Sequence, residues 1–141
     1  MFAQLLAAEH STDAQTVLYR SVGNAGNVET AKGCVARVDT CPPVTFARPA
    51  TGRRGEPVKL RVTVTDAIPG SPTATVVVKI RTRAGKLLRT LPATAVATNA
   101  AASMTWARCR LAAGSYRYEV LATDAAGNAQ SRIGAGRLTV K

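Results

Sequence analysis

Apolar and polar residues alternate along three stretches in the second half of the chain. From Val58 to Thr65 every second side chain is apolar, and residues 75–82 and 116–122 repeat the pattern. Such alternation is typical of a strand that has one buried face and one solvated face. We therefore predict a long strand in each of these stretches.

Shorter strands are expected between and after the three long ones. Residues 83–86 have the composition of a hairpin turn, and residues 124–128 that of another turn. The further strands are predicted at 87–91, 95–98 and 103–108, and in a last segment that ends at Val140. About seven short strands in residues 44–141 predict an all-β fold, an immunoglobulin- or fibronectin III-like antiparallel β-sandwich.

Residues 1–43 follow a different pattern. Their apolar residues between positions 2 and 19 predict one or two short helices, and Ser11 or Asp13 could cap the second. Residues 21–43 are rich in glycine and proline and predict a loop or linker. We expect a helical or irregular segment with a linker at 1–43, which could be the tail of a preceding domain, and the sandwich at 44–141.

The positive charge is concentrated in the predicted sandwich. The chain has a formal net charge of +11, but residues 1–43 carry three basic and four acidic side chains, whereas residues 44–141 carry sixteen and four, a net of +12. A domain this basic attracts polyanions through its long-range potential and counterion release. Nucleic acid, anionic lipid and phosphate-rich wall polymers are candidate partners, and the alternative is a solvated surface that reflects an arginine- and alanine-rich composition.

Strand parity predicts where the basic side chains lie. The candidate polyanion-binding residues are Lys79, Arg81, Arg83 and Arg117, which we expect on one positive surface. Strands 75–82 and 116–122 are neighbours in sandwiches of this type, whereas Lys59 and Arg61 would lie on the other sheet. Charge on both faces favours diffuse adhesion over a sharp nucleic-acid groove, which would also need exposed aromatic residues for stacking.

Catalytic groups are scarce in the predicted sandwich. The one histidine, His10, lies outside it, so a serine, threonine or cysteine nucleophile there has no imidazole base. Glu119 and Asp124 could pair for glycoside hydrolysis, but we expect Glu119 on a solvated strand face and Asp124 in a turn. These observations predict that the chain is not an enzyme and holds no cofactor.

A calcium site could be built from the oxygen ligands of Asp66, Asp124 and Asn128. Their spacing fits no known calcium loop, and Asp124 and Asn128 flank Gly127 in a stretch that has the composition of a hairpin turn. The cysteine spacing likewise fits no zinc site. We therefore interpret the Asp124 and Asn128 positions as turn residues and predict no metal.

Three cysteines leave room for one disulfide. Cys34 could pair with Cys41 or with Cys109, and Cys41 could pair with Cys109. We favour Cys41–Cys109, because closing a loop of about 68 residues is worth roughly 4 kcal/mol in the chain-entropy model. A disulfide would indicate an oxidising compartment.

The first residues lack the regions of a signal peptide, and no apolar run reaches transmembrane length. We therefore predict no membrane span. If the protein is exported, we expect this chain to be a piece of a longer one.

Three segments carry a resemblance to a known family. They are the hairpin VKIRTRAGKLLRTL at 78–91, the lone Trp106, and LAAGSY at 111–116 leading to ATDAAGN at 122–128. Together they resemble the bacterial Ig-like modules related to the Ig-like domain of the flagellar hook-capping protein, over about residues 56–141. The resemblance implies a β-sandwich that serves as a repeat or accessory module of secreted and surface proteins and has no catalytic residues to carry over.

Two aromatic residues are expected to hold this sandwich together. Trp106 has the largest apolar surface in the chain and is predicted to pack between the sheets. Tyr116 follows Gly114 and can form a tyrosine corner, in which the hydroxyl bonds a backbone group.

The leading functional hypothesis is a non-catalytic Ig-like module of an exported, extracellular or envelope-bound protein. It would act as a spacer, adhesive or accessory domain toward an anionic envelope polymer or another protein domain. The alternatives are a basic nucleic-acid-binding protein and the C-terminal accessory tail of a secreted hydrolase.

Overall fold

The structure, a computed structural model, describes residues 2–10, 15–36, 39–67 and 70–141. The chain divides into two compact units, Met1–Asp39 and Thr40–Lys141. The predicted boundary between residues 43 and 44 lies just after this division. The residues that the structure describes form strands and turns, and they include no helix that could cross a membrane.

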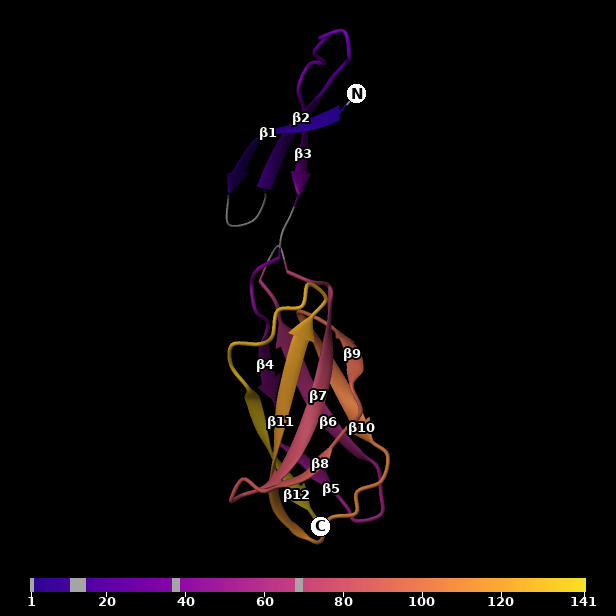
Figure 1. The fold of residues 1–141 in the computed structure, drawn as a ribbon. Helices are drawn as coiled ribbons and strands as arrows, with labels where there is room; N and C mark the ends of the chain where they lie inside the picture. The colour runs from indigo at the N-terminus through magenta and orange to yellow at the C-terminus, as the bar shows by residue number, and fades with distance from the viewer. Residues whose placement is uncertain (1, 11–14, 37–38, 68–69) are drawn as a thin grey trace. The chain divides into compact units, whose positions relative to one another are not determined.

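The first unit is an antiparallel three-stranded sheet (Figure 1). β1 (Phe2–His10) pairs with β2 (Gln15–Val22), which pairs with β3 (Lys32–Ala36). After β2 the chain turns at Gly26, whose φ of 80° a glycine adopts without steric cost.

The prediction of helices in the first unit was therefore wrong, and so was the prediction that 21–43 is all loop. Residues 15–22 are rich in β-branched and aromatic residues, which favour strands. Pairing with β1 and β3 satisfies the backbone groups of β2 on both sides, so tertiary pairing overrides the weak helical pattern. The proposed caps Ser11 and Asp13 lie outside the described residues.

The second unit contains two sheets. The β6 sheet is antiparallel in the order β10–β6–β4, with β4 (Val44–Ala47), β6 (Val58–Thr65) and β10 (Ala100–Trp106). The β11 sheet has the order β5–β12–β11–β7–β8, and β9 also pairs with β7. Its strands are β5 (Ala50–Gly52), β7 (Thr73–Thr82), β8 (Leu87–Thr90), β9 (Thr94–Ala97), β11 (Gly114–Asp124) and β12 (Gly134–Val140).

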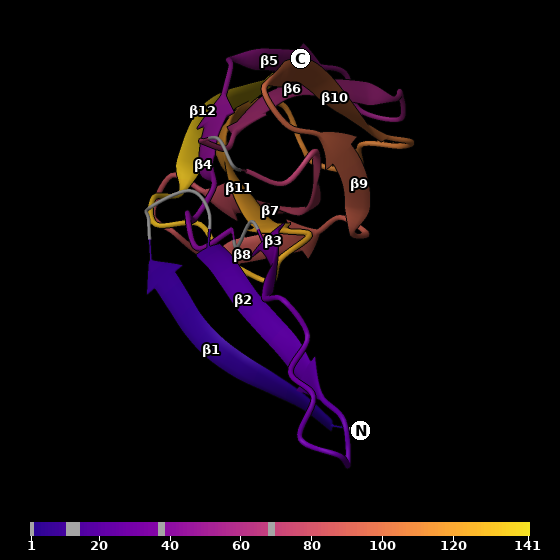
Figure 2. The same ribbon diagram turned by 90° about the horizontal axis from the view of Figure 1, so that it is seen from above.

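The core of the second unit lies between these two sheets, and Figure 2 shows β6 and β10 on one side of it and β7, β8 and β11 on the other. β6 contributes every second residue, from Val58 to Val64, and the alternate residues of β7 and β11 do the same. Trp106 is 6% exposed, as predicted, and Tyr118 is fully buried. The Tyr116 hydroxyl donates to the Ala112 carbonyl oxygen at 2.9 Å, which confirms the tyrosine corner.

A buried threonine ties the two sheets together. The Thr45 hydroxyl of β4 donates to the Val120 carbonyl oxygen at 3.0 Å and accepts from the Gly134 amide at 2.7 Å. Because a buried hydroxyl is costly without partners, these bonds hold β4 in place against β11 and β12.

The all-β sandwich predicted from the sequence is confirmed. β6 has the predicted bounds, and the predicted strands from β7 to β12 all form, with ends shifted by a few residues. The short strands β4 and β5 were missed, because three or four residues show no periodicity and because each depends on a neighbour distant in sequence.

The favoured disulfide, Cys41–Cys109, was wrong. The Cys109 thiol is free and buried. The backbone amide of Cys109 donates to the carbonyl oxygen of Glu56, just before β6 begins. Cys41 lies near the opposite end of β6, because it precedes Val44, which pairs with Thr65. Eight strand residues span about 23 Å, far beyond the roughly 7 Å between Cα atoms that a disulfide allows. We therefore withdraw the inference of an oxidising compartment that rested on this disulfide.

Candidate polyanion-binding site

The four predicted binding residues gather on the outer face of the β11 sheet. Arg81 on β7 pairs directly with Arg117 on β11, and Lys79 lies one outward position along β7. Arg83 follows the end of β7 and lines the same hollow as Arg117. The structure thus places these side chains together, and their binding role stays a prediction.

An acidic side chain neutralises part of this face. Glu119 lies opposite Lys79 in the pairing of β11 with β7. Its carboxylate accepts a hydrogen bond from Arg81 Nε at 2.9 Å and lies 3.3 Å from Arg117 Nη2. The side chain of Glu119 is 14% exposed. Arg81 is therefore held in an ion pair on the sheet surface, and Glu119 neutralises part of the charge that a ligand could bind.

Sequence reasoning missed Arg137 on this face. Arg137 on β12 pairs with Arg117, and together with Arg83 these residues line a hollow of about 310 Å³. The signal was present, since Leu138 and Val140 are buried and alternation then turns residue 137 outward. The last strand was predicted only at its end, so its partner was not considered.

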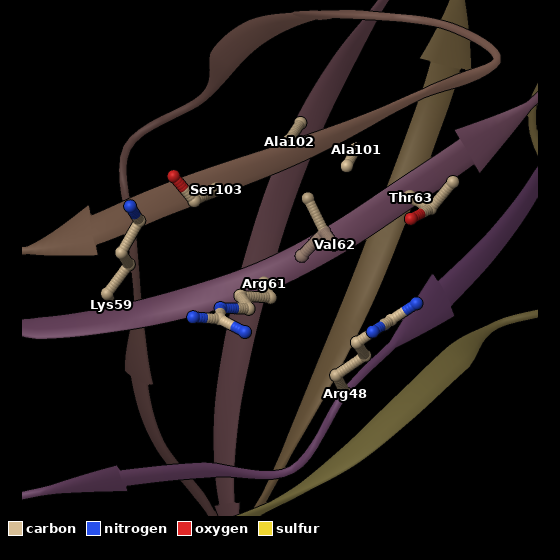
Figure 3. A pocket seen from close by; sticks show the side chains of 8 residues that line it. All are labelled: Arg48, Lys59, Arg61, Val62, Thr63, Ala101, Ala102 and Ser103. Carbon is tan, nitrogen blue, oxygen red and sulfur yellow. The ribbon is translucent and has the colours of Figure 1, made fainter.

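The β6 sheet presents a second basic face, shown in Figure 3. Lys59 and Arg61 point outward between the buried residues of β6, and Arg48 joins them from the segment that follows β4. These cations line a hollow of about 390 Å³, whose other lining residues are Val62, Thr63, Ala101, Ala102 and Ser103. The prediction that Lys59 and Arg61 lie on the other sheet is confirmed, and Arg48 was missed because β4 was missed.

The same three cations line a neighbouring hollow. It measures about 540 Å³ and is completed by Pro49, Ala50, Thr51 and Pro57. Among the described residues, no Asp or Glu lines either hollow. The β6 face therefore offers Arg48, Lys59 and Arg61 between two concave surfaces, with no lining carboxylate to compete for them.

The backbone beneath these cations is fixed from the core. The Arg48 amide donates to the Arg61 carbonyl oxygen at 3.1 Å. The Tyr118 hydroxyl, reaching across from β11, donates to the Arg48 carbonyl oxygen and lies 3.2 Å from that of Arg61. Burial raises the pKa of Tyr118, so the hydroxyl keeps the proton that it donates.

Two of the remaining carboxylates are buried at the end of the sandwich where β6 and β11 finish. Asp66 and Asp124 are 3% and 5% exposed, and carboxylate oxygens of the two lie within 4.8 Å of each other. Asp66 accepts from the Ser71 amide at 2.9 Å. Asp66 and Asp124 were considered together in the sequence as oxygen ligands, and they lie close because β6 and β11 finish at the same end of the sandwich.

The turn interpretation of Asp124 and Asn128 is confirmed. The Asp124 carboxylate accepts from the Asn128 amide at 2.8 Å and from its side-chain Nδ2 at 2.9 Å, and Gly127 has a φ of 92°. Burial acts to raise the pKa of Asp124, but the hydrogen bonds from Asn128 and the turn backbone outweigh it and hold the pKa below its ordinary value.

The geometry separates the two carboxylates that a glycosidase would need. Glu119 lies on the outer face of β11, whereas Asp124, the last residue of the same strand, is buried. Two catalytic carboxylates must flank one glycosidic bond. These two side chains point to opposite faces of the β11 sheet and cannot do so.

The fold and its outer faces define an all-β sandwich module with basic surfaces. No family model matches the chain, and no curated protein matches it. A solved structure that it is similar to is the CARDB domain of the PF1109 protein from Pyrococcus furiosus, in complex with di-metal ions. The identity is 15%, the TM-score is 0.44, and the match covers 75% of this chain and 94% of that one. The metal ions are a property of that protein. Of what the hook-capping resemblance implied, the two packed sheets of the second unit show the β-sandwich alone.

Proposed function

We propose that this chain is a non-catalytic Ig-like module of an exported bacterial protein that adheres to anionic envelope polymers. It would serve as the spacer, adhesive or accessory domain of a longer protein. The observation that supports the proposal most is the way the four acidic residues of the second unit are placed.

None of these four carboxylates opposes the outward basic side chains of the β6 sheet. Asp66 and Asp124 are buried, Glu119 is bound by arginines, and Glu56 lies in the loop before β6 and lines neither basic hollow. A net charge of +12 in a unit of this size creates a positive potential around both sheets. Such a potential attracts a long polyanion without requiring a deep pocket.

Co-sedimentation with purified bacterial walls tests this proposal. Walls that carry phosphate polymers should retain the full chain at low ionic strength, and walls stripped of those polymers should retain much less of it. The stripped walls are the control for non-specific trapping. Equal retention on both preparations would contradict the proposal.

A basic nucleic-acid-binding protein is the second candidate function. Phe46 on β4 is 55% exposed and pairs with Thr63, so an aromatic ring lies on the same outer face as Arg48 and Arg61. Exposed aromatic rings beside cations are what single-stranded nucleic acid binders use for stacking. The retention of an oligonucleotide, compared with a wall polymer of equal charge, decides between the two functions.

A further inference from the structure

The two basic faces of the second unit differ in how much charge they leave for a ligand. On the β11 face the Glu119 carboxylate engages Arg81 and Arg117. On the β6 face the strands β4, β6 and β10 contain no Asp or Glu at all. A ligand on the β6 face can therefore bind three cations without competing against a carboxylate of the same sheet.

The β6 face is also held in a fixed shape. Lys59 and Arg61 stand two residues apart on one strand, about 6.6 Å along it, and both project to the same side. The Arg48 amide bonds to the Arg61 carbonyl oxygen, and the Tyr118 hydroxyl anchors the Arg48 backbone from the core. A pre-positioned set of cations loses less freedom on binding than side chains on a loop would lose.

Small side chains leave room over this set of cations. Ala101 and Ser103 on β10 stand opposite Thr63 and Arg61 of β6, and all four side chains face outward. Both hollows are lined by the three cations, one together with residues of β10 and the other with residues of β5, so an extended chain bound to the cations can contact both. A guanidinium matches the oxygens of a phosphate in a bidentate arrangement, and a lysine adds a point charge.

We propose that the outer face of the β6 sheet, through Arg48, Lys59 and Arg61, is the principal site at which this module binds consecutive phosphate groups of an extended envelope polymer. This inference rests on the proposed function and adds the face and the chemical group. The one exposed aromatic ring on these strands, Phe46, provides a single stacking surface, whereas single-stranded nucleic acid is held by stacking of successive bases. A phosphate polymer is therefore the ligand that this face favours.

Two matched double variants of the full chain test the site. Lys59→Gln with Arg61→Gln removes two charges from the β6 face, and Lys79→Gln with Arg83→Gln removes two from the β11 face. Glu119 forms its ion pairs with Arg81 and Arg117, so both double variants leave these ion pairs in place. The probe is poly(glycerol phosphate), and its Kd is measured by titration at constant ionic strength.

We expect the β6-face variant to bind at least about tenfold more weakly than the parent, because each lost cation removes a charge-assisted contact. The β11-face variant should bind less than about threefold more weakly than the parent, because it loses only long-range attraction, which both double variants lose alike. The single variant Arg48→Gln should weaken binding in the same direction as the β6-face pair. Thermal melting of all variants shows whether the fold is retained.

Other outcomes overturn the inference in distinguishable ways. Equal losses in the two double variants would mean diffuse attraction, which removes the site and leaves the proposed function standing. A parent that does not bind poly(glycerol phosphate) would overturn both. Tighter binding of an oligothymidylate of equal charge, abolished by the β6-face pair, would keep the site and replace the polymer with nucleic acid.

Discussion

Trp106 is the largest side chain in the core of the second unit, and 6% of its surface is exposed. Trp106→Ala removes the ring and leaves a cavity between the sheets. We expect a loss of about 3–5 kcal/mol in the free energy of unfolding, enough to unfold a domain of ordinary stability. Urea denaturation followed by far-UV circular dichroism measures the loss. A variant that unfolds at nearly the same urea concentration as the parent would show that the ring contributes little to the core.

Gly136 on β12 leaves the space that the Tyr118 ring fills. A Cβ atom at Gly136 would stand 2.6 Å from Cε1 and 2.8 Å from Cζ of Tyr118, and 3.0 Å from the Arg48 carbonyl oxygen. Gly136→Ala must therefore shift the ring or the strand, and we expect a cost of about 1–3 kcal/mol. Chemical denaturation measures it. In a Tyr118→Leu background the same substitution should cost less, and an unchanged cost would show that the ring is not what the methyl group meets.

Sequence parity could place single residues wherever the strand was recognised. Lys59 and Arg61 were placed on the opposite sheet from Lys79 and Arg81, and the structure has them there. Arg48 could not be placed in this way. Its position depends on β4, whose register is set by β6 and by the Tyr118 hydroxyl, and these partners are distant in sequence.

The turn between β11 and β12 makes a prediction at the scale of elements. The pKa of Asp124 is depressed in the folded state by its Asn128 and backbone hydrogen bonds, although burial opposes them. A depressed pKa contributes stability that is present above the unfolded value and is lost as the pH falls through the folded value. We expect the free energy of unfolding to decline as the pH drops below about 4.

Asn128→Ala isolates this contribution. The substitution removes the Nδ2 hydrogen bond, so the pKa of Asp124 should move upward and the decline in acid should become shallower. The difference between the parent and the variant reports on Asp124. Urea denaturation at a series of acidic pH values measures both slopes, and identical slopes would contradict the role of the turn.

The elements that were predicted well and badly differ in where their hydrogen-bond partners lie. β6 has eight residues with strict alternation, so its pattern alone defines it. β2 contains adjacent apolar residues that fit a helix or a strand equally, and only its pairing with β1 and β3 decides. The disulfide prediction failed for a related reason. The chain-entropy model compares pairings by loop length alone, and loop length does not indicate which end of β6 each cysteine lies near.

At the scale of the whole molecule, salt dependence connects the charge to the site. Double-stranded DNA and wall polymers should both be retained at low ionic strength and released together near physiological salt, with no DNA sequence preference, because counterion release drives both. Retention on columns of each polymer across a salt series measures this. Tight, sequence-selective DNA binding at physiological salt would contradict the adhesive function.

The slope of the salt dependence further distinguishes a site from diffuse attraction. A single-stranded polymer contributes about −0.7 per phosphate to the slope of log K against log salt, so three phosphates on the Arg48, Lys59 and Arg61 face predict a slope of about −2 for poly(glycerol phosphate). Loss of Lys59 and Arg61 should bring the slope to roughly −0.7, while loss of Lys79 and Arg83 should leave it near the parent value. Titrations at several salt concentrations give all three slopes. A parent slope much steeper than this, reduced equally by either pair, would mean that the polymer wraps both sheets, because the number of phosphates engaged would then exceed what the β6 face can hold.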